Sequence, residues 1–320
     1  MKNFDHHMGG TIMDRLVAEE IQRLGQEITS LQGARILPIY GGFSSDRKYV
    51  VGLEGEQKRL LRVFDPARMD NKQKEFSILQ EMERYGVKSP RALELGRTSW
   101  AGYMLVSYID GEDAERNLPE FSDAEQLHIG IETGVELRKM HQLQAPEDVS
   151  SWYERKVRKH YRYMEQYEAC PLRINNEDRI IAFIDEHIRY MQDRPNLFQH
   201  DDVHPANLVV KDRHLAGIID FERYDWGDPI HEFLKLGFFG RHVSIPYCIG
   251  QIQGYLDGEA PDEEFWTLYS LYTAMALFSS VVWTLKTAPE TMDTMQGHMD
   301  KVLEDHNYFR QVRPSWYDPS

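Results

Sequence analysis

The chain is poor in cysteine. Only Cys170 and Cys248 occur among its 320 residues, far apart and without the spacing of metal ligands. A disulfide framework and a zinc ribbon are therefore excluded, and a reducing cytoplasm is the expected location. Residues 1–15 lack an apolar core, so the pattern predicts no secretory signal there.

Basic residues are too few to balance the acidic ones, and the formal net charge is −15. Residues 1–107 carry 16 Lys and Arg against 14 Asp and Glu, whereas residues 108–320 carry 21 against 38. A negative field disfavours nucleic acid and anionic membranes and attracts cations. We therefore expect a small cationic partner, with no nucleic acid and no membrane bound. The length fits two domains or one bilobal enzyme, as a monomer or dimer.

One segment, residues 265–285, contains no charged residue and is long enough to cross a bilayer. Serine and threonine interrupt it, and its apolar residues recur at helical spacing. That spacing is typical of a helix that presents a stripe to a protein core. We predict a buried helix.

Acidic and amide side chains gather in two neighbouring segments. Asp202 precedes Asn207 by five residues, and Asp220 ends the apolar run 215–219. Two short strands flanking a turn would bring Asn207 and Asp220 to one place. Phosphoryl transfer needs a group that orients and deprotonates the attacking hydroxyl, and oxygen ligands for Mg²⁺. Asp202 suits the first task, and Asn207 with Asp220 the second.

The same loop allows a second interpretation, as a metal hydrolase. His200, Asp202 and His204 alternate in a way that could present ligands to zinc or to a di-metal centre. Pro205 and Asn207 have no role in such a site. We expect His200 to be a buried structural histidine, and His204 to orient the loop by hydrogen bonds.

These segments resemble the catalytic loop and metal-binding segment of the aminoglycoside phosphotransferase and choline kinase-like family, a branch of the protein kinase-like fold. The family's loop reads His, any residue, Asp, four residues, Asn, which matches His200, Asp202 and Asn207. Its second position is usually Gly, but this chain has Asp201. The extra charge could raise the proton affinity of Asp202 or help to recruit a cation. The resemblance also implies that Asp228 braces the loop.

The resemblance implies an α+β, bilobal protein kinase-like fold, with a small five-stranded antiparallel N-lobe and a mostly helical C-lobe. The expected domains are an N-terminal helix and extension, a nucleotide-binding N-lobe, and a C-lobe that binds the acceptor and carries the catalytic residues, over residues 1–30, 31–107 and 108–320. Strand patterns cover residues 35–40, 48–53, 59–64, 91–96 and 102–107, and helical patterns cover residues 12–28 and 71–85.

Glycines at 41 and 42 lie between two predicted strands, so they form no Walker loop. Their backbone could close over phosphates, with Ser44 or Ser45 as donors. In the kinases that the chain resembles, a cation on the third strand grips the phosphates and pairs with a Glu on the next helix. The matching residues are Arg62 and Glu75.

Two further positions bear on the nucleotide. Lys58 could compete with Arg62, although it lies at the start of the strand. Residues 104–111 resemble the hinge between kinase lobes, where a base would bind the backbone near Ser107 and Ile109. Side chains there do not distinguish ATP from GTP.

The family phosphorylates hydroxyls of small molecules, including aminoglycosides, macrolides, choline, ethanolamine, fructosamines and homoserine. The resemblance implies a phosphotransferase that uses ATP (or GTP) and Mg²⁺. An aminoglycoside-like antibiotic is the favoured acceptor, which would make the chain a resistance enzyme, and a metabolic kinase for choline, homoserine or an amino sugar is the alternative. A protein kinase is disfavoured, because the stretch from Asp220 to Trp226 leaves no room for a long activation loop. A nucleotide-binding module without transferase activity is the remaining class.

Acceptor specificity is expected from carboxylates of the helical lobe, for which we name Glu222, Asp225 and Glu232. An acidic solvated face without a binding role is the competing interpretation. Aromatic residues could form a cage for a cationic amine or could belong to the core; they are Trp152, Tyr161 and Tyr224.

Overall fold

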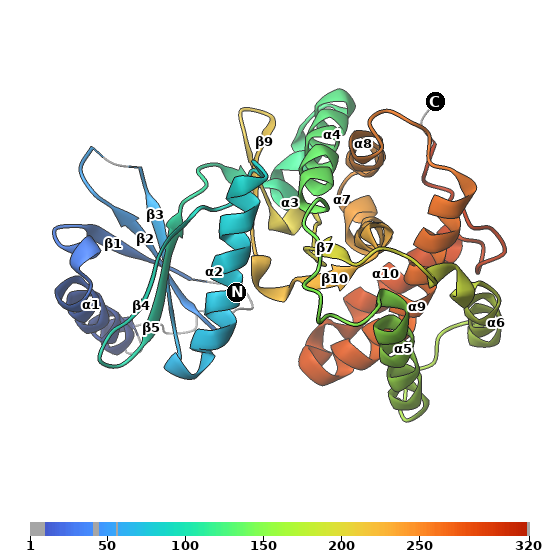
Figure 1. Cartoon of the computed structure of the whole chain (residues 1–320), viewed down its shortest axis with the longest axis horizontal. Helices are drawn as coiled ribbons and strands as arrows, with labels where there is room; N and C mark the ends of the chain where they lie inside the picture. The colour runs from blue at the N-terminus through green and yellow to red at the C-terminus, as the bar shows by residue number, and fades with distance from the viewer. Residues whose placement is uncertain (1–9, 41–44, 56, 319–320) are drawn as a thin grey trace, which may run out of the picture. The chain divides into compact units, whose positions relative to one another are not determined.

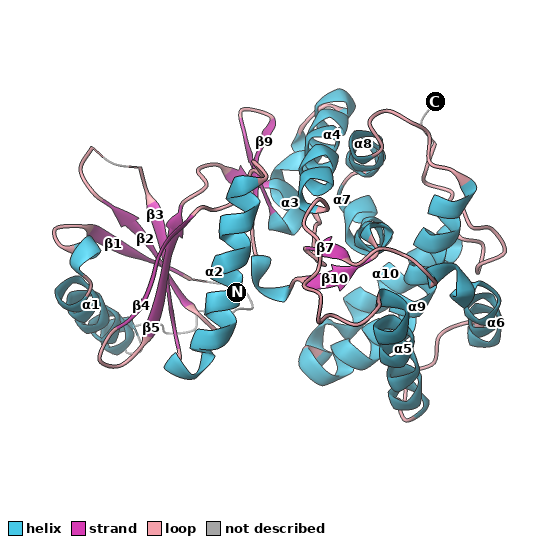
Figure 2. Cartoon of the chain, in the orientation of Figure 1, coloured by secondary structure: helices cyan, strands magenta, loops and turns pink. Residues whose placement is uncertain are grey.

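A computed structural model describes residues 10–40, 45–55 and 57–318, and its contacts divide the chain into two compact units. The first unit comprises residues 1–84 and 89–109, and the second comprises residues 85–88 and 110–320. Figures 1 and 2 show that sheet dominates the first unit and helix the second. Helix α1 (Gly10–Glu27) belongs to the first unit, because its side chains pack on the sheet there.

The first unit contains the predicted five-stranded antiparallel sheet, in the order β1-β2-β3-β5-β4. Helix α2 (Met69–Arg84) follows β3. The predicted bounds of β3 and β5 match those observed, and the other bounds differ by one or two residues. The strands are β1 (Arg35–Ile39), β2 (Arg47–Gly52), β3 (Arg59–Phe64), β4 (Ala92–Arg97) and β5 (Gly102–Ser107).

Alternation along β3 sends its side chains to opposite faces of the sheet. Leu61 and Val63 are fully buried in an apolar core that includes Leu24 of α1. Arg62, between them, points the other way and contacts Glu75 of α2. Arg62 thus pairs with a residue of α2, while its neighbours in β3 form the core.

The second unit is mostly helical, as predicted, with short strands around the proposed catalytic loop. Strand β7 pairs with β10, and a small sheet has the order β6-β8-β9. The longer helices are α4 (Asp123–Met140), α5 (Trp152–Glu168), α6 (Glu177–His187), α8 (Ile245–Tyr255), α9 (Glu263–Thr287) and α10 (Met292–Asp305). The short elements are β6 (Glu112–Asp113), α3 (Ala114–Asn117), β7 (Leu197–Gln199), β8 (Leu208–Lys211), β9 (His214–Ile218), β10 (Asp225–Gly227) and α7 (Arg241–Val243).

Helices α4 and α8 approach each other closely at glycines. Gly130 and Gly134 lie one turn apart on α4, and Gly250 and Gly254 repeat this spacing on α8. A Cβ atom on any of the four would lie less than 3.0 Å from backbone of the facing helix, and at Gly250 that atom is the carbonyl oxygen of Leu127. Glycine is required here because only a residue without a Cβ lets two helix backbones come this near.

Helix α9 is long and apolar enough to cross a membrane by length and composition. Most of its side chains are buried, however, and it packs on α5, α6 and α10. The uncharged run 265–285 is therefore a core helix of the second unit, as its periodicity predicted.

Candidate active site

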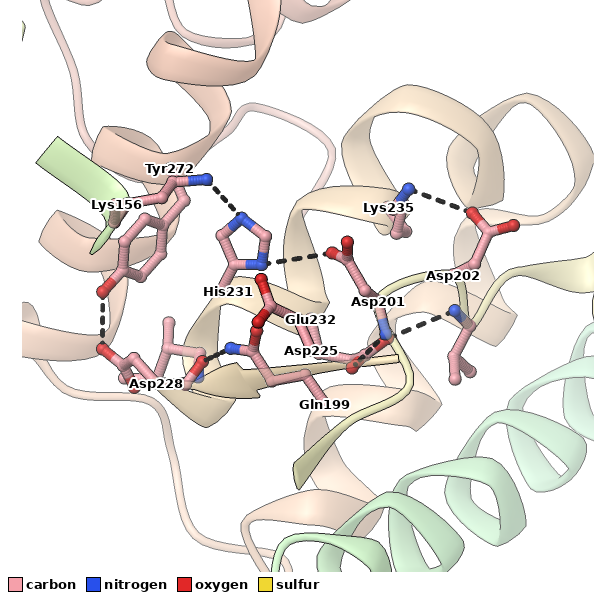
Figure 3. Close-up of polar contacts among 12 residues, drawn as sticks. Lys156, Gln199, Asp201, Asp202, Asp225, Asp228, His231, Glu232, Lys235 and Tyr272 are labelled. Atoms are coloured by element: carbon pink, nitrogen blue, oxygen red, sulfur yellow. Dashed lines mark hydrogen bonds and ion pairs between the residues drawn. The ribbon is translucent and has the colours of Figure 1, made fainter. Parts of the chain in front are cut away.

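The proposed catalytic loop joins β7 to β8 in the second unit, and Glu232 supports its backbone. The Glu232 carboxylate accepts hydrogen bonds from the N–H groups of Asp201 at 3.0 Å and Val203 at 3.3 Å (Figure 3). Burial, with the nearby charge of Asp201, raises the pKa of Glu232 to about 7. This corrects the expectation that Glu232 binds the acceptor, because its side chain is 0% exposed and is used inside the protein.

Three side chains hold Asp202 in place. Lys235 Nζ lies 3.0 Å from Oδ1, and Asn207 Nδ2 lies 3.0 Å from Oδ2. His204 Nε2 lies 3.6 Å from Oδ1. Burial acts to raise the pKa of Asp202, but His204 and Lys235 outweigh it and hold the pKa well below its usual range. The carboxylate is therefore ionised and oriented.

The pKa of Asp202 is low in spite of the neighbouring Asp201, which from the sequence could have raised the proton affinity of Asp202. Its φ of 62° is left-handed, which Asp tolerates better than most residues and which glycine adopts freely. Its Oδ1 lies 3.4 Å from His231 Nδ1, and His231 Nε2 lies 2.6 Å from Lys156 Nζ (Figure 3). Burial raises the pKa of Asp201 and lowers that of Lys156 to about 7. Asp201 thus lies in the electrostatic field of Lys235, Lys159 and Lys156, cationic groups of the protein itself.

Asn207 and Asp220 lie at the same end of the β8–β9 hairpin. Leu208 pairs with Ile218, and the N–H of Ile219 donates to the carbonyl oxygen of Asn207 at 2.9 Å. Asn207 Nδ2 donates to Asp202, which leaves its Oδ1 available as an acceptor. Asp220 is exposed, with a left-handed φ of 70°. An amide oxygen and a carboxylate at one hairpin end are oxygen donors that fit Mg²⁺.

His200 connects the loop to the residue that follows β9. Its side chain is fully buried, and Nε2 lies 2.9 Å from the carbonyl oxygen of Ile219, beside Asp220. Burial lowers the pKa of His200 to about 4, so the ring stays neutral. Among the described residues, His200, Asp202 and His204 do not converge as metal ligands. This geometry does not support the zinc hydrolase interpretation.

Asp228 is fully buried, and its carboxylate is saturated by partners. Arg194 donates to both oxygens, at 2.8 and 3.1 Å, and Tyr272 donates to Oδ2 at 2.8 Å. Gln199, the last residue of β7, donates to the carbonyl oxygen of Asp228 (Figure 3). These contacts suit the bracing role proposed for Asp228 and leave no oxygen directed to a metal.

The other candidate acceptor residues are dispersed. Asp225 is paired with Arg155 at 2.9 Å, and Glu222 is partly exposed on the short helical turn after Asp220. Trp152 is buried against Tyr272, Tyr224 stacks on Phe198, and Tyr161 is 49% exposed. The three aromatics therefore have separate environments and do not form one cage.

In the first unit, the expected contact between Arg62 and Glu75 is present, and it belongs to a buried charge cluster. Arg62 Nη2 lies 2.7 Å from Asp46, which also contacts Lys72 at 2.7 Å and Arg68 at 2.6 Å. Burial opposes ionisation of Asp46, but Arg62 and Lys72 lower its pKa. Asp46, Arg68 and Lys72 were not predicted, because they come from separate segments that only folding joins.

The other residues expected to bind the nucleotide differ in their contacts within the protein. Ser45 accepts a hydrogen bond from Arg68 at 2.6 Å, whereas Ser44 lies outside the described residues. The N–H of Ser107 donates to the carbonyl oxygen of Arg91 at 2.9 Å, so it is not available to a base. Ile109 is half-buried at the end of the first unit. Lys58 lies over the ring of Tyr108.

Comparison with known proteins finds a family model that covers most of the chain. The model of the phosphotransferase enzyme family matches residues 35–269. A gentamicin complex of APH(2″)-IIa is similar, with 14% identity, a TM-score of 0.62 and coverage of 97% of this chain and 100% of the other. So is an AMP-PNP and hygromycin B complex of a thermostable mutant of aminoglycoside phosphotransferase APH(4)-Ia, with 15% identity, a TM-score of 0.63 and coverage of 88% and 97%.

A putative fructosamine-3-kinase from Haemophilus somnus 129PT is also similar, with 12% identity, a TM-score of 0.60 and coverage of 89% and 96%. No curated protein sequence matches the chain. At these identities the solved structures establish the kinase-like fold, and the family model covers most of the chain. The chain therefore belongs to the phosphotransferase enzyme family and is a phosphotransferase with a hydroxyl group as acceptor.

Proposed function

We propose that this protein transfers the γ-phosphate of ATP to a hydroxyl group of a small molecule. The observation that carries the proposal is the setting of Asp202, ionised and hydrogen-bonded to Asn207 at 3.0 Å, in a loop whose far end adjoins Asp220. The solved relatives with ATP, ADP and AMP-PNP support the choice of nucleotide.

Asp202 acts mainly by orienting the attacking hydroxyl. Its low pKa makes it a weak base, but phosphoryl transfer passes through a loose transition state that needs little proton removal early. A fixed carboxylate that accepts the hydroxyl hydrogen places the oxygen in line with the phosphorus. Lys235, beside the same carboxylate, offsets negative charge at the transferring group.

Asn207 and Asp220 would hold Mg²⁺, and Arg62 would bind the phosphates with Glu75 as its support. Bound Mg²⁺ neutralises charge on the phosphate oxygens. Arg62 already has a fixed orientation, because Asp46 and Glu75 hold its guanidinium. A permanently charged, planar donor set of this kind suits phosphate.

For the acceptor, the first candidate is a cationic amino compound of the aminoglycoside kind. The second unit has a formal net charge of −16, against +1 for the first unit, and Glu222 and Asp225 follow the proposed metal ligand Asp220 in sequence. Relatives bound to gentamicin, hygromycin B and streptomycin support this class. Such a compound would make the protein an antibiotic-modifying enzyme.

A second candidate is favoured by the cations around the two loop aspartates. Lys235 contacts Asp202, and Lys156, Lys159 and Lys235 all act electrostatically on Asp201. Asp225 is already paired with Arg155. Because the positive and negative groups balance here, the site suits an acceptor with a single amine, such as an amino sugar, or a zwitterion, such as homoserine. It suits a polycation less well.

A radiolabelled phosphate-transfer screen tests both classes. The full-length protein with Mg²⁺ and γ-labelled ATP is offered aminoglycosides, macrolides, amino sugars, choline-like amines and homoserine. Labelling of polybasic acceptors alone selects the first candidate, and labelling of monobasic or zwitterionic acceptors selects the second. If a protein substrate is labelled and none of the hydroxyl compounds is, the small-molecule proposal is wrong.

The variant that tests Asp202 is Asp202→Asn, because its side chain keeps the size of aspartate and the contact with Asn207. We expect transfer to fall at least about 10³-fold while nucleotide affinity changes little, because an amide cannot hold the hydroxyl as a carboxylate does. Unchanged transfer in this variant would exclude Asp202 from the reaction.

A further inference from the structure

A second cluster of chemically active side chains lies where α4 packs on the β8–β9 hairpin. His128 and Glu132 are one helical turn apart on α4, so they share a face. His214 is the first residue of β9. Each of the three offers a nitrogen or oxygen atom, and these atoms all lie within 4.8 Å of one another.

The distances have the scale of a metal site. His214 Nδ1 lies 3.3 Å from Glu132 Oε1, and His128 Nε2 lies 3.9 Å from the same oxygen. Ligands about 2.0–2.1 Å from a tetrahedral zinc ion are about 3.3–3.4 Å apart. The pair of Glu132 and His214 therefore already has the required spacing, and the pair of Glu132 and His128 must close by about 0.5 Å.

A backbone contact orients the carboxylate in advance, and a tight turn positions the backbone of His214. The N–H of Leu215 donates to Glu132 Oε2 at 2.6 Å, which leaves Oε1 facing the two rings. Asp212 and Arg213 both have left-handed φ values, of 51° and 62°, which define the tight turn that delivers His214. Hydrogen bonds that fix a ligand in this way strengthen metal binding.

Access and charge are compatible with an ion. The side chains of His128 and His214 are 53% and 60% exposed, so an ion can enter and water can complete its coordination. Lys88 Nζ lies 3.4 Å from Glu132 Oε1, but it also donates to the carbonyl oxygen of Leu215 at 2.9 Å and keeps that partner when an ion binds. Two imidazoles and one carboxylate favour zinc-type metals over Mg²⁺.

We propose that His128, Glu132 and His214 bind a divalent transition metal ion of the Zn²⁺ type, which fastens the β8–β9 hairpin to α4. The site is separate from the proposed Mg²⁺ ligands, because His214 lies at the turn of the hairpin while Asn207 and Asp220 lie at its opposite end. Its role is structural, and it does not depend on phosphate transfer.

The test uses the full-length, metal-stripped protein without nucleotide, in a His6→Ala, His7→Ala background, since an adjacent histidine pair could itself bind metal. Zn²⁺ is titrated by calorimetry, and Co²⁺ serves as the spectroscopic probe. We expect one saturable Zn²⁺ site, with affinity at least about tenfold weaker in His128→Gln and in His214→Gln, because each loses a direct ligand. His187→Gln, which changes a histidine on α6, leaves the affinity unchanged.

Imidazole NMR of the His6→Ala, His7→Ala parent protein gives a second readout, which follows the metal ligands directly. Zn²⁺ should shift the ring signals of two histidines, those lost in His128→Gln and His214→Gln. The absence of saturable binding below millimolar Zn²⁺, or equal affinity in both variants and the parent, overturns the proposal. Neither result bears on the phosphotransferase activity.

Discussion

Lys235 and Asp202 form the ion pair at the centre of the proposed active site, with Nζ 3.0 Å from Oδ1. They are 33 residues apart in sequence, and Lys235 follows the segment that contains Glu232. One short segment therefore supports the loop backbone through a buried carboxylate and orients the loop carboxylate through an ammonium group.

Replacing Lys235 by methionine should slow transfer without abolishing it. The variant keeps the side-chain length but loses the charge beside the reacting groups, so kcat should fall roughly 10- to 100-fold with a smaller change in KM for ATP. Steady-state kinetics measure both. Lys301→Met on α10 is the control, since Lys301 pairs only with the exposed Glu304 in the described contacts. Equal kcat in the two variants would contradict a role for Lys235.

Asp220→Asn should raise the Mg²⁺ concentration needed for activity. The amide keeps the left-handed backbone conformation that Asp220 adopts but removes an anionic metal ligand. We expect the half-saturating Mg²⁺ concentration to rise at least about tenfold. Asp212→Asn is matched to it, because Asp212 is also exposed and left-handed on the same hairpin. A similar Mg²⁺ requirement in all three proteins would remove Asp220 from the metal site.

Arg62→Met should destabilise the first unit and weaken nucleotide binding. The change leaves Asp46 and Glu75 buried with Lys72 as a shared cation, and removing one member of a buried ion pair costs about 3 kcal/mol. Hydrogen exchange of the β3 and α2 amides should become faster. Arg97→Ala, at the exposed end of β4, should change the stability by less than about 0.5 kcal/mol.

Glu232 should make the stability of the second unit depend on pH. Its pKa is about 7 when folded, against an ordinary 4.5, so the folded state binds the proton more tightly. The stabilisation from protonated Glu232 is complete below about pH 4.5 and is lost as the pH rises to about 7. Relative to Glu232→Gln, the free energy of unfolding should therefore decrease across this range by up to about 3 kcal/mol.

Urea unfolding at several pH values, followed by tryptophan fluorescence, measures this difference. Five of the six tryptophans belong to the second unit, so the signal reports on that unit. Glu290→Gln serves as the control because Glu290 is exposed. A constant difference between the parent and Glu232→Gln from pH 4.5 to 7 would show that Glu232 titrates normally.

Gly250→Ala should destabilise the packing of α4 on α8. The added Cβ overlaps the carbonyl oxygen of Leu127, and backbone can move away only if the helices separate. Overpacking of this kind costs about 1–3 kcal/mol, measurable as a lower Tm. Gly297→Ala in α10 meets no atom within 4 Å, so it should be neutral or stabilise the protein by about 0.5–1 kcal/mol. Equal Tm changes in the two variants would exclude the steric explanation.

Local patterns in the sequence were sufficient for several features. Strand β3 follows from its apolar alternation, and the juxtaposition of Asn207 and Asp220 follows from two short strands joined by a turn. Arg62 was placed correctly against Glu75 by the resemblance to kinases, in which a cation on the third strand pairs with a Glu on the next helix. These features depend on residues close in the chain, where backbone geometry limits the possible contacts.

Tertiary structure decided which charged groups meet. Lys235 reaches Asp202, and Lys72 reaches Asp46, from segments whose sequences carry no sign of a partner. The sequence predicts that Glu232 is an accessible acidic residue, but packing buries it against the loop backbone. The sequence by itself determined which residues are the candidates for the reaction and their local spacing. Burial and long-range pairing, which set the charge and orientation of those residues, depend on contacts between segments distant in the chain, and only the folded structure determines them.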